Sequence, residues 1–310
     1  MTSLPLLDDF LLSLKVNNYS QETIYNYERD LEVFENFLND SKLNFDKLIK
    51  RDILNYKAFL TSIDRITAKK QKTQVKLSAY SINRMLSALR AYFKYLIDND
   101  YPVPVPPDAI KMLKTIKKKS QVPELEQLVK LIESPNKFET NKKIVLRNRA
   151  ILEVLFATGL RISELVNIKT NQVDKEGKIF VLGKGKKERF VYLTPRAIKH
   201  LNTYLEIRQD QSPYLFVPLR GLHASDKFKK LSTNYLQERI KRYRELLDIN
   251  IPASAHSLRH GFATYLAENG ASPAAIQILL GHESLDTTTR YVHASDKYAQ
   301  KIHQKFHPLK

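Results

Sequence analysis

A run of closely spaced prolines divides the chain into two parts. The segment YPVPVPPDAI, residues 101–110, contains four prolines. Each proline fixes its own φ angle and pushes the preceding residue out of the helical region, so no helix can continue through this segment. The chain has 310 residues, of which 43% are hydrophobic, and this is enough to fill two ordinary cores. We therefore expect two domains, the first formed by residues 1–103.

Apolar residues in the first domain recur at the 3.6-residue period of an α-helix. One such stripe follows Ser20, which is placed to cap the start of a helix, and further stripes follow Asp46 and Ser81. A short apolar set precedes them and consists of Leu6, Leu7, Phe10, Leu11 and Leu14. The pattern predicts a bundle of about four helices.

Residues 104–120 have the composition of a basic linker. Five lysines lie between Lys111 and Lys119, so this segment is positively charged and could follow a phosphate backbone. We expect it to connect the first domain to a second domain over residues 121–310.

The second domain combines helices with one short sheet. An apolar helix is expected from Arg147 to Ala157, with Gly159 at its C-cap and a new helix beginning near Arg161. Two β-rich runs, 178–182 and 188–193, are joined by a Gly-Lys-Gly turn and predict a hairpin. After these runs the pattern returns to helix nearly to the C-terminus. The predicted fold class is therefore mainly α, with a small antiparallel β-sheet in the second domain.

The charge balance points to a polyanionic partner. Lys and Arg total 51 against 33 Asp and Glu, which gives a net charge of +18 and a pI near 9.7. Such an excess is typical of nucleic-acid-binding proteins, although a solvated basic surface that aids solubility is the alternative. The chain has no cysteine, which excludes disulfides, thiolate nucleophiles and cysteine-ligated zinc. Without a secretory signal or an apolar run approaching ~18 residues, we expect a cytoplasmic protein with no membrane partner.

The segment HSLRH gathers two histidines and an arginine on one predicted helix. His256 and His260 share a face, which is also the spacing of some zinc ligands. However, Arg259 lies between them, and a cation one turn away opposes the binding of a metal ion, so no metal is expected. Arg259 and His256 can instead hold the oxygens of a phosphate. No P-loop spacing occurs in the chain, and no ATP site or other cofactor is expected.

Four motifs in fixed order resemble the catalytic domain of the tyrosine recombinases, the phage integrase family, and are most similar to Xer-type recombinases. The motifs are ATGLRISEL, LGKGKKERFVYL, HSLRHGFAT and LLGHESLDTTTRYVH, and they span Arg161 to Tyr291. The helical first domain resembles the core-binding, SAM-like domain of this family in pattern alone. The resemblance implies a site-specific recombinase that cleaves and rejoins DNA through a 3′-phosphotyrosine and a Holliday junction.

The catalytic residues of the family are carried over position by position. They fall on Arg161, Lys184, His256, Arg259, His282 and Tyr291. In these roles the arginines stabilise the pentavalent phosphate, Tyr291 is the nucleophile, His256 accepts its proton, and Lys184 is the general acid for the leaving 5′ oxygen. Lys184 is chosen over the lysines that follow it because of the Gly-Lys-Gly turn.

Two further residues are expected to support the site. Glu164 is expected to orient a neighbouring arginine or lysine, and His260 to assist without contacting the substrate. In the tail, Tyr298, Ile302 and Phe306 form an apolar stripe on an expected C-terminal coupling helix. Packing of this helix on a neighbouring protomer would couple the protomers, whereas packing on its own domain would only stabilise that domain.

The resemblance also implies the partners. They are double-stranded DNA with inverted repeats and a homotetramer on two sites, or a heterotetramer with a paralogous recombinase, with a DNA translocase as a possible activator. The protein would then be nucleoid-associated and act in chromosome or plasmid dimer resolution or in mobile-element integration. Two alternatives stay open: a type IB topoisomerase, which would relax supercoils without joining two sites, and a DNA-binding accessory protein that has lost catalysis.

Overall fold

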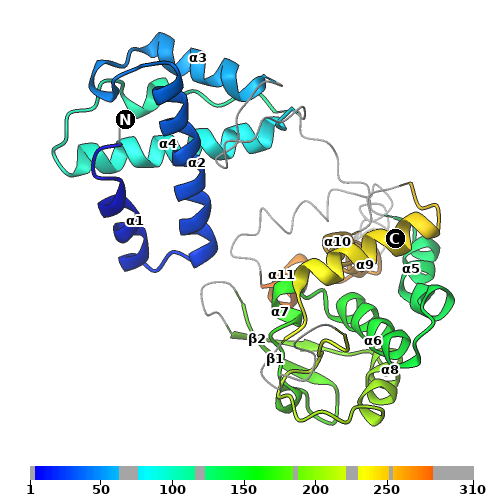
Figure 1. The fold of residues 1–310 in the computed structure, drawn as a ribbon. Coiled ribbons are helices and arrows are strands. Elements are labelled where there is room, and N and C mark those ends of the chain that lie inside the picture. Colours follow the sequence, from blue (N-terminus) through cyan, green and yellow to red (C-terminus); the bar gives the residue numbers. More distant parts are fainter. Residues whose placement is uncertain are drawn as a thin grey trace, which may run out of the picture. The chain divides into compact units, whose positions relative to one another are not determined.

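The computed structural model describes residues 4–62, 76–115, 123–183, 188–220, 230–250 and 254–281. They fall into two compact units, Met1–Lys118 and Lys119–Lys310 (Figure 1). The fold is mainly helical with one small antiparallel sheet, which confirms the predicted fold class. Within the described ranges, no helix is both long and apolar enough to span a membrane.

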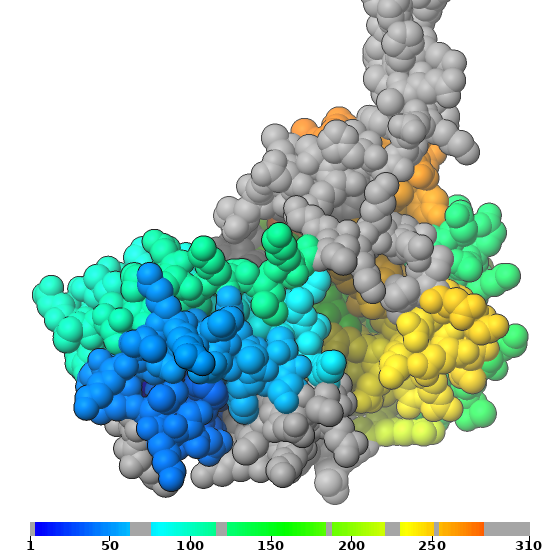
Figure 2. Space-filling view, turned by 90° about the horizontal axis from the view of Figure 1, so that it is seen from above, coloured from blue at the N-terminus to red at the C-terminus, as the bar shows by residue number. Residues whose placement is uncertain are grey.

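The first unit is a helical bundle, as the periodicity predicts. Its long helices are α1 (Leu7–Val16), α2 (Gln21–Asp40), α3 (Lys50–Thr61) and α4 (Ala79–Asp98), with a short 3₁₀ turn η1 (Phe45–Lys47) before α3. Figure 2 shows the residues of this unit, coloured blue to teal, as one continuous body. Aromatic rings fill its core: the ring centroids of Phe34 and Tyr56 lie 4.8 Å apart, and Phe93 packs against Phe34 at 6.4 Å.

Hydrogen-bonded caps fix where these helices begin. The Ser20 side chain accepts the backbone N–H of Thr23 at 3.1 Å, so the predicted cap of α2 is confirmed. Helix α4 begins earlier than expected, because Ser78 is its cap and accepts the N–H of Ser81 at 3.1 Å. Both serines can cap a helix, and their spacing alone does not show which of them does so.

The proline-rich segment belongs to the first unit. Val105 is 1% exposed and Ile110 is fully buried in the core of that unit, on either side of a 3₁₀ turn, η2 (Pro107–Ala109). Asn83 of α4 donates to the carbonyl of Leu113 at 3.0 Å and accepts its N–H at 2.7 Å. The first half of the expected 104–120 linker is therefore packed against α4. Prolines end a helix, but they do not prevent an extended apolar segment from being buried.

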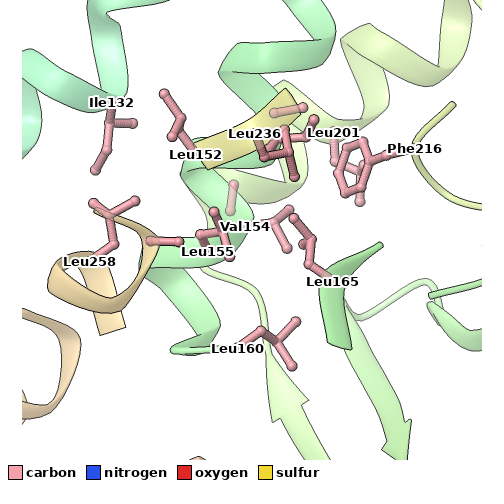
Figure 3. Packing of buried hydrophobic residues seen from close by; sticks show 14 of the residues in the cluster. Ile132, Leu152, Val154, Leu155, Leu160, Leu165, Leu201, Phe216, Leu236 and Leu258 are labelled. Atoms are coloured by element: carbon pink, nitrogen blue, oxygen red, sulfur yellow. The ribbon is translucent and has the colours of Figure 1, made fainter. Parts of the chain in front are cut away.

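The second unit is built around one buried helix, α6 (Lys142–Thr158). The helices beside it are α5 (Leu125–Phe138), α8 (Pro195–Glu206) and α10 (Ala255–Glu268), and the unit also contains α7 (Ile162–Leu165), η3 (Thr170–Gln172), α9 (Thr233–Leu246) and α11 (Pro273–Leu280). Leu152, Val154 and Leu155 of α6 lie at the centre of the core (Figure 3). Asn141 caps α6 by accepting the N–H of Ile144. The helix therefore begins at Lys142, earlier than the start at Arg147 that the sequence pattern predicted.

The predicted hairpin is confirmed. Strand β1 (Lys178–Leu182) pairs antiparallel with β2 (Glu188–Tyr192), with Val181 opposite Arg189. Side chains alternate along β2, so that Val191 and Arg189 are buried while their neighbours are exposed. Gly159 ends α6 with φ at 62°, as expected of a C-cap glycine, but the helix that follows it, α7, is a single turn.

Candidate active site

Arg161 lies three residues beyond the end of α6, in the turn that leads into α7. As the N-cap of α7, its backbone N–H donates to Oε2 of Glu164 at 2.8 Å, and its Nη1 donates to Oε1 of the same carboxylate at 3.0 Å. The Arg161 side chain is 36% exposed, whereas the Glu164 side chain is only 6% exposed. The carboxylate thus holds the backbone and one nitrogen of the guanidinium of Arg161, while the rest of the guanidinium stays accessible.

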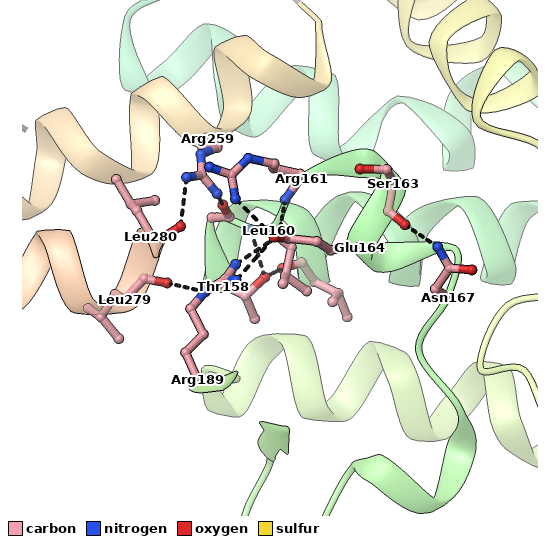
Figure 4. Close-up of polar contacts among 12 residues, drawn as sticks. Thr158, Leu160, Arg161, Ser163, Glu164, Asn167, Arg189, Arg259, Leu279 and Leu280 are labelled. Atoms are coloured by element: carbon pink, nitrogen blue, oxygen red, sulfur yellow. Dashed lines mark hydrogen bonds and ion pairs between the residues drawn. The ribbon is translucent and has the colours of Figure 1, made fainter. Parts of the chain in front are cut away.

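Arg259 comes to the same turn from α10. Its Nη1 donates to the carbonyl of Gly159 and its Nη2 donates to the carbonyl of Leu280, both at 2.7 Å, and the residue is 3% exposed. Figure 4 shows Arg161 and Arg259 together at the C-terminal end of α6. Both of these acceptors are neutral carbonyl oxygens, so the two bonds orient the guanidinium without cancelling its charge.

His256 and His260 form a contact on α10. Their Nε2 atoms lie 2.7 Å apart, and the rings meet edge to face with centroids 4.3 Å apart. One ring must therefore donate its N–H to an unprotonated nitrogen of the other. Burial lowers the pKa of His256 below its ordinary 6.5, and the charges of Arg259 and Arg161 lower it further. At neutral pH the imidazole of His256 is thus uncharged and able to accept a proton.

Arg189 of β2 completes the cluster, and sequence reasoning missed it. Its Nη1 and Nη2 donate to Glu164 at 3.1 and 2.7 Å, and its Nε donates to the carbonyl of Leu279 at 3.0 Å. The signal was present in the sequence, because an arginine at an inward-facing position of an alternating strand must find a buried partner. Glu164 thus contacts two arginines, and together the three residues carry one net positive charge.

The structure brings together Arg161, His256, Arg259, Glu164 and His260 of the residues predicted from sequence. Lys184, His282 and Tyr291 lie outside the described residues, as does the tail with Tyr298, Ile302 and Phe306. Among the residues that are described, no three His, Asp or Glu side chains are placed to hold a metal ion.

Both units match known families. Residues 121–298 match the phage integrase family, and residues 7–100 match the phage integrase N-terminal SAM-like domain. The chain is 31% identical to tyrosine recombinase XerD of Staphylococcus epidermidis, with 98% of each chain covered. It is 34% identical to tyrosine recombinase XerC of Leptospira interrogans, over 96% of this chain and 92% of the relative. These matches confirm the resemblance to Xer-type recombinases.

Solved structures share the fold. XerH site-specific recombinase bound to its palindromic difH substrate is 22% identical, with a TM-score of 0.71 over 94% of this chain and 81% of that one. A lambda integrase tetramer bound to a Holliday junction is 18% identical, with a TM-score of 0.70 over 94% and 76% of the two chains. None of these matches supports the topoisomerase or accessory-protein alternatives. The chain belongs to the phage integrase family and is a tyrosine recombinase, an enzyme that cleaves DNA at specific sites and exchanges its strands.

Proposed function

We propose that Arg161, Arg259 and His256 together bind and activate the scissile phosphate. Arg161 and Arg259 stabilise the charge that develops on the non-bridging oxygens, and His256 accepts the proton of the nucleophile. The observation that supports this assignment is that Arg161 and Arg259 meet at the turn after α6 (Figure 4), while His256 lies on α10 three residues before Arg259. The charges of both arginines lower the pKa of His256, in addition to the effect of burial. An anion bound between them gains electrostatic stabilisation from charges that are already in place, and no reorganisation is required during the reaction.

The remaining steps are assigned to residues that the resemblance supplies. The hydroxyl oxygen of Tyr291 attacks phosphorus, and its proton passes to His256. The bond from phosphorus to the 5′ bridging oxygen breaks, and Lys184 protonates that leaving oxygen. The product is a 3′-phosphotyrosine, and attack by another 5′ hydroxyl reverses the step and frees Tyr291. His282 donates a hydrogen bond to the same phosphate. Neither ATP nor a metal ion enters this balance.

We propose the assembly by analogy with the matched proteins. Four protomers bind two DNA sites with inverted repeats, as a homotetramer or together with a paralogous recombinase, and strand pairs are exchanged through a Holliday junction. The similarity to XerC and XerD over nearly the whole chain favours an Xer-like task, the resolution of chromosome or plasmid dimers, over mobile-element integration. A cytoplasmic, nucleoid-associated location and activation by a DNA translocase belong to the same proposal.

A crossed rescue experiment tests these roles. Single-turnover cleavage of a nicked site is measured for Arg161→Ala and Lys184→Ala on three substrates: ordinary DNA, DNA with a methylphosphonate at the scissile position, and DNA with sulfur as the 5′ bridging atom. Each variant is expected to cleave ordinary DNA at least ~100-fold more slowly than the parent protein. The neutral methylphosphonate removes the charge that Arg161 compensates, whereas sulfur leaves without a proton.

Each modified DNA substrate should therefore rescue only one of the two variants. The methylphosphonate should restore much of the cleavage by Arg161→Ala, and the bridging sulfur much of the cleavage by Lys184→Ala. Lys186→Ala, two residues further along the sequence, is the matched control. Rescue of Lys186→Ala by sulfur would show that the wrong lysine was chosen, and an Arg161→Ala variant that cleaves ordinary DNA normally would refute the proposed site.

A further inference from the structure

Arg189 occupies an unusual position for a charged residue. It lies in β2 with its side chain turned to the buried face of the hairpin, where the adjacent inward positions are Val181 and Val191. Its side chain is only 6% exposed. Burying a cation is unfavourable unless its partners compensate for the lost water, and here they are the carboxylate of Glu164 and the carbonyl of Leu279. Two of the three hydrogen bonds end on Glu164, which also binds Arg161, and the third ends on Leu279 near the end of α11.

The first connection runs through Glu164 to Arg161. Two hydrogen bonds from Arg189 and two from Arg161 meet on this carboxylate. Burial alone raises the pKa of Glu164, but the hydrogen bonds and charges of the two arginines outweigh burial and leave the pKa lowered. Arg189 is the more deeply buried of the two arginines, and its hydrogen bonds and charge contribute the larger share of the effect that keeps Glu164 ionised. Arg161 is then held in place while its own guanidinium remains exposed to a ligand.

The second connection runs to the end of α11. Nε of Arg189 donates to the carbonyl of Leu279, and a Cβ added at Gly281 would lie 3.0 Å from Cδ of Arg189. Gly281 has φ at 62° and is the C-cap of α11, directly before His282 in the sequence. One side chain thus contacts Glu164, the partner of Arg161, and the end of α11 that precedes His282 in the sequence (Figure 4). Its own strand begins four residues after Lys184 in the sequence.

We infer that Arg189 is a positioning residue of the recombinase site, which sets the orientation of Arg161 through Glu164 and fixes the C-terminal turn of α11 against β2. The inference rests on the proposed role of Arg161. Arg189 itself does not contact the phosphate, and its effect on cleavage is exerted through the groups that it holds.

The test compares two buried arginines of the same unit. Arg149 has a side chain 6% exposed and pairs at 2.8 Å with Glu153, which is 5% exposed, so it matches the Arg189–Glu164 pair in burial and chemistry. It is not part of the candidate active site. Arg189→Gln, Arg189→Lys and Arg149→Gln are compared with the parent protein in thermal unfolding, half-site binding and single-turnover cleavage, at a temperature where each protein is folded.

Arg189→Gln is expected to cleave about 10- to 100-fold more slowly, the range found for residues that orient the ligands of a metal site. Its half-site affinity should be unchanged, and the methylphosphonate that rescues Arg161→Ala should also rescue Arg189→Gln. Arg149→Gln should lose thermal stability but cleave ordinary DNA at the parent rate. Arg189→Lys keeps the charge but cannot span both Glu164 and Leu279, so a smaller loss of rate is expected, and it replaces the Gln variant if that variant does not fold.

The outcomes separate the two proposals. If Arg189→Gln cleaves as fast as Arg149→Gln, or is slow without methylphosphonate rescue, Arg189 does not act through Arg161 and the inference is overturned. If Arg161→Ala itself cleaves normally, the proposed function fails, whatever Arg189→Gln does. Slow cleavage with the same rescue in Arg189→Gln and Arg161→Ala supports both.

Discussion

A methyl group added at Gly159 should destabilise the protein and displace Arg259, which donates a hydrogen bond to the carbonyl of Gly159. Gly159 ends α6 with φ at 62°, and a Cβ there would lie 2.5 Å from Cδ1 of Phe262 and 2.9 Å from Cδ2 of Leu280. The left-handed conformation costs a non-glycine residue about 1–2 kcal/mol. Overpacking in a core costs about 1–3 kcal/mol. For Gly159→Ala the two effects together predict a loss of about 2–5 kcal/mol in the free energy of unfolding.

Gly270→Ala is the matched control for this substitution. Gly270 also has a positive φ, 92°, but nothing lies within 4 Å of the position its Cβ would take. It should therefore lose only the backbone contribution, about 1–2 kcal/mol. The free energy of unfolding is measured for both variants by urea denaturation, and the difference between them isolates the contacts with Phe262 and Leu280.

Cleavage provides the functional readout for the same pair. The carbonyl of Gly159 accepts a hydrogen bond from Arg259, so movement of this turn also displaces an arginine of the site. Gly159→Ala should cleave nicked DNA more slowly than Gly270→Ala when both are folded. Equal losses of stability and equal cleavage rates in the two variants would refute the reasoning, because Gly159 would then not be confined by α10 and α11.

Two other predictions concern electrostatics and assembly. By NMR titration of the DNA-free protein, the pKa of His256 should lie below 6.5 and should rise in Arg161→Gln but not in Arg196→Gln. The pKa of His200, which the charge of Arg196 helps to lower, should rise in Arg196→Gln but not in Arg161→Gln. Since the unfolded protein then binds protons more readily at His256, stability should fall as the pH drops below 6.5, and a His256 pKa above 6.5 would contradict this account. Truncation after Ala294 should leave folding and half-site binding intact but abolish cooperative full-site assembly and strand exchange; a truncated protein that still recombines would refute coupling through the tail, and one that unfolds would show that the tail stabilises its own domain.

Several features of the fold and site follow from local sequence patterns. The Ser20 cap, the Gly159 C-cap and the hairpin each depend on residues close together in the chain. The spacing of His256 and Arg259 likewise places both on one helix, where the structure has them. In these cases backbone geometry over a few residues decides the result, so the pattern alone is sufficient.

Other features depend on contacts between distant segments, and these could not be predicted. The alternation along β2 marks Arg189 as an inward-facing residue that needs a partner, but it does not identify that partner, because Glu164 lies on another element and only the folded chain brings the two together. Burial of Val105 and Ile110 against the first unit depends on packing that a proline pattern does not encode. The bonds from Arg259 to the carbonyls at the ends of α6 and α11 are likewise tertiary contacts.

The most direct test of the central claim is the covalent intermediate. Nicked site DNA is incubated with the parent protein and with Tyr291→Phe, the reaction is stopped with detergent, and the DNA-linked peptide is identified by mass spectrometry. The account predicts a detergent-resistant adduct joined through a 3′ phosphate to Tyr291, and no adduct in Tyr291→Phe although DNA binding is nearly unchanged. An adduct that persists in Tyr291→Phe, or that maps to Tyr298, would contradict it.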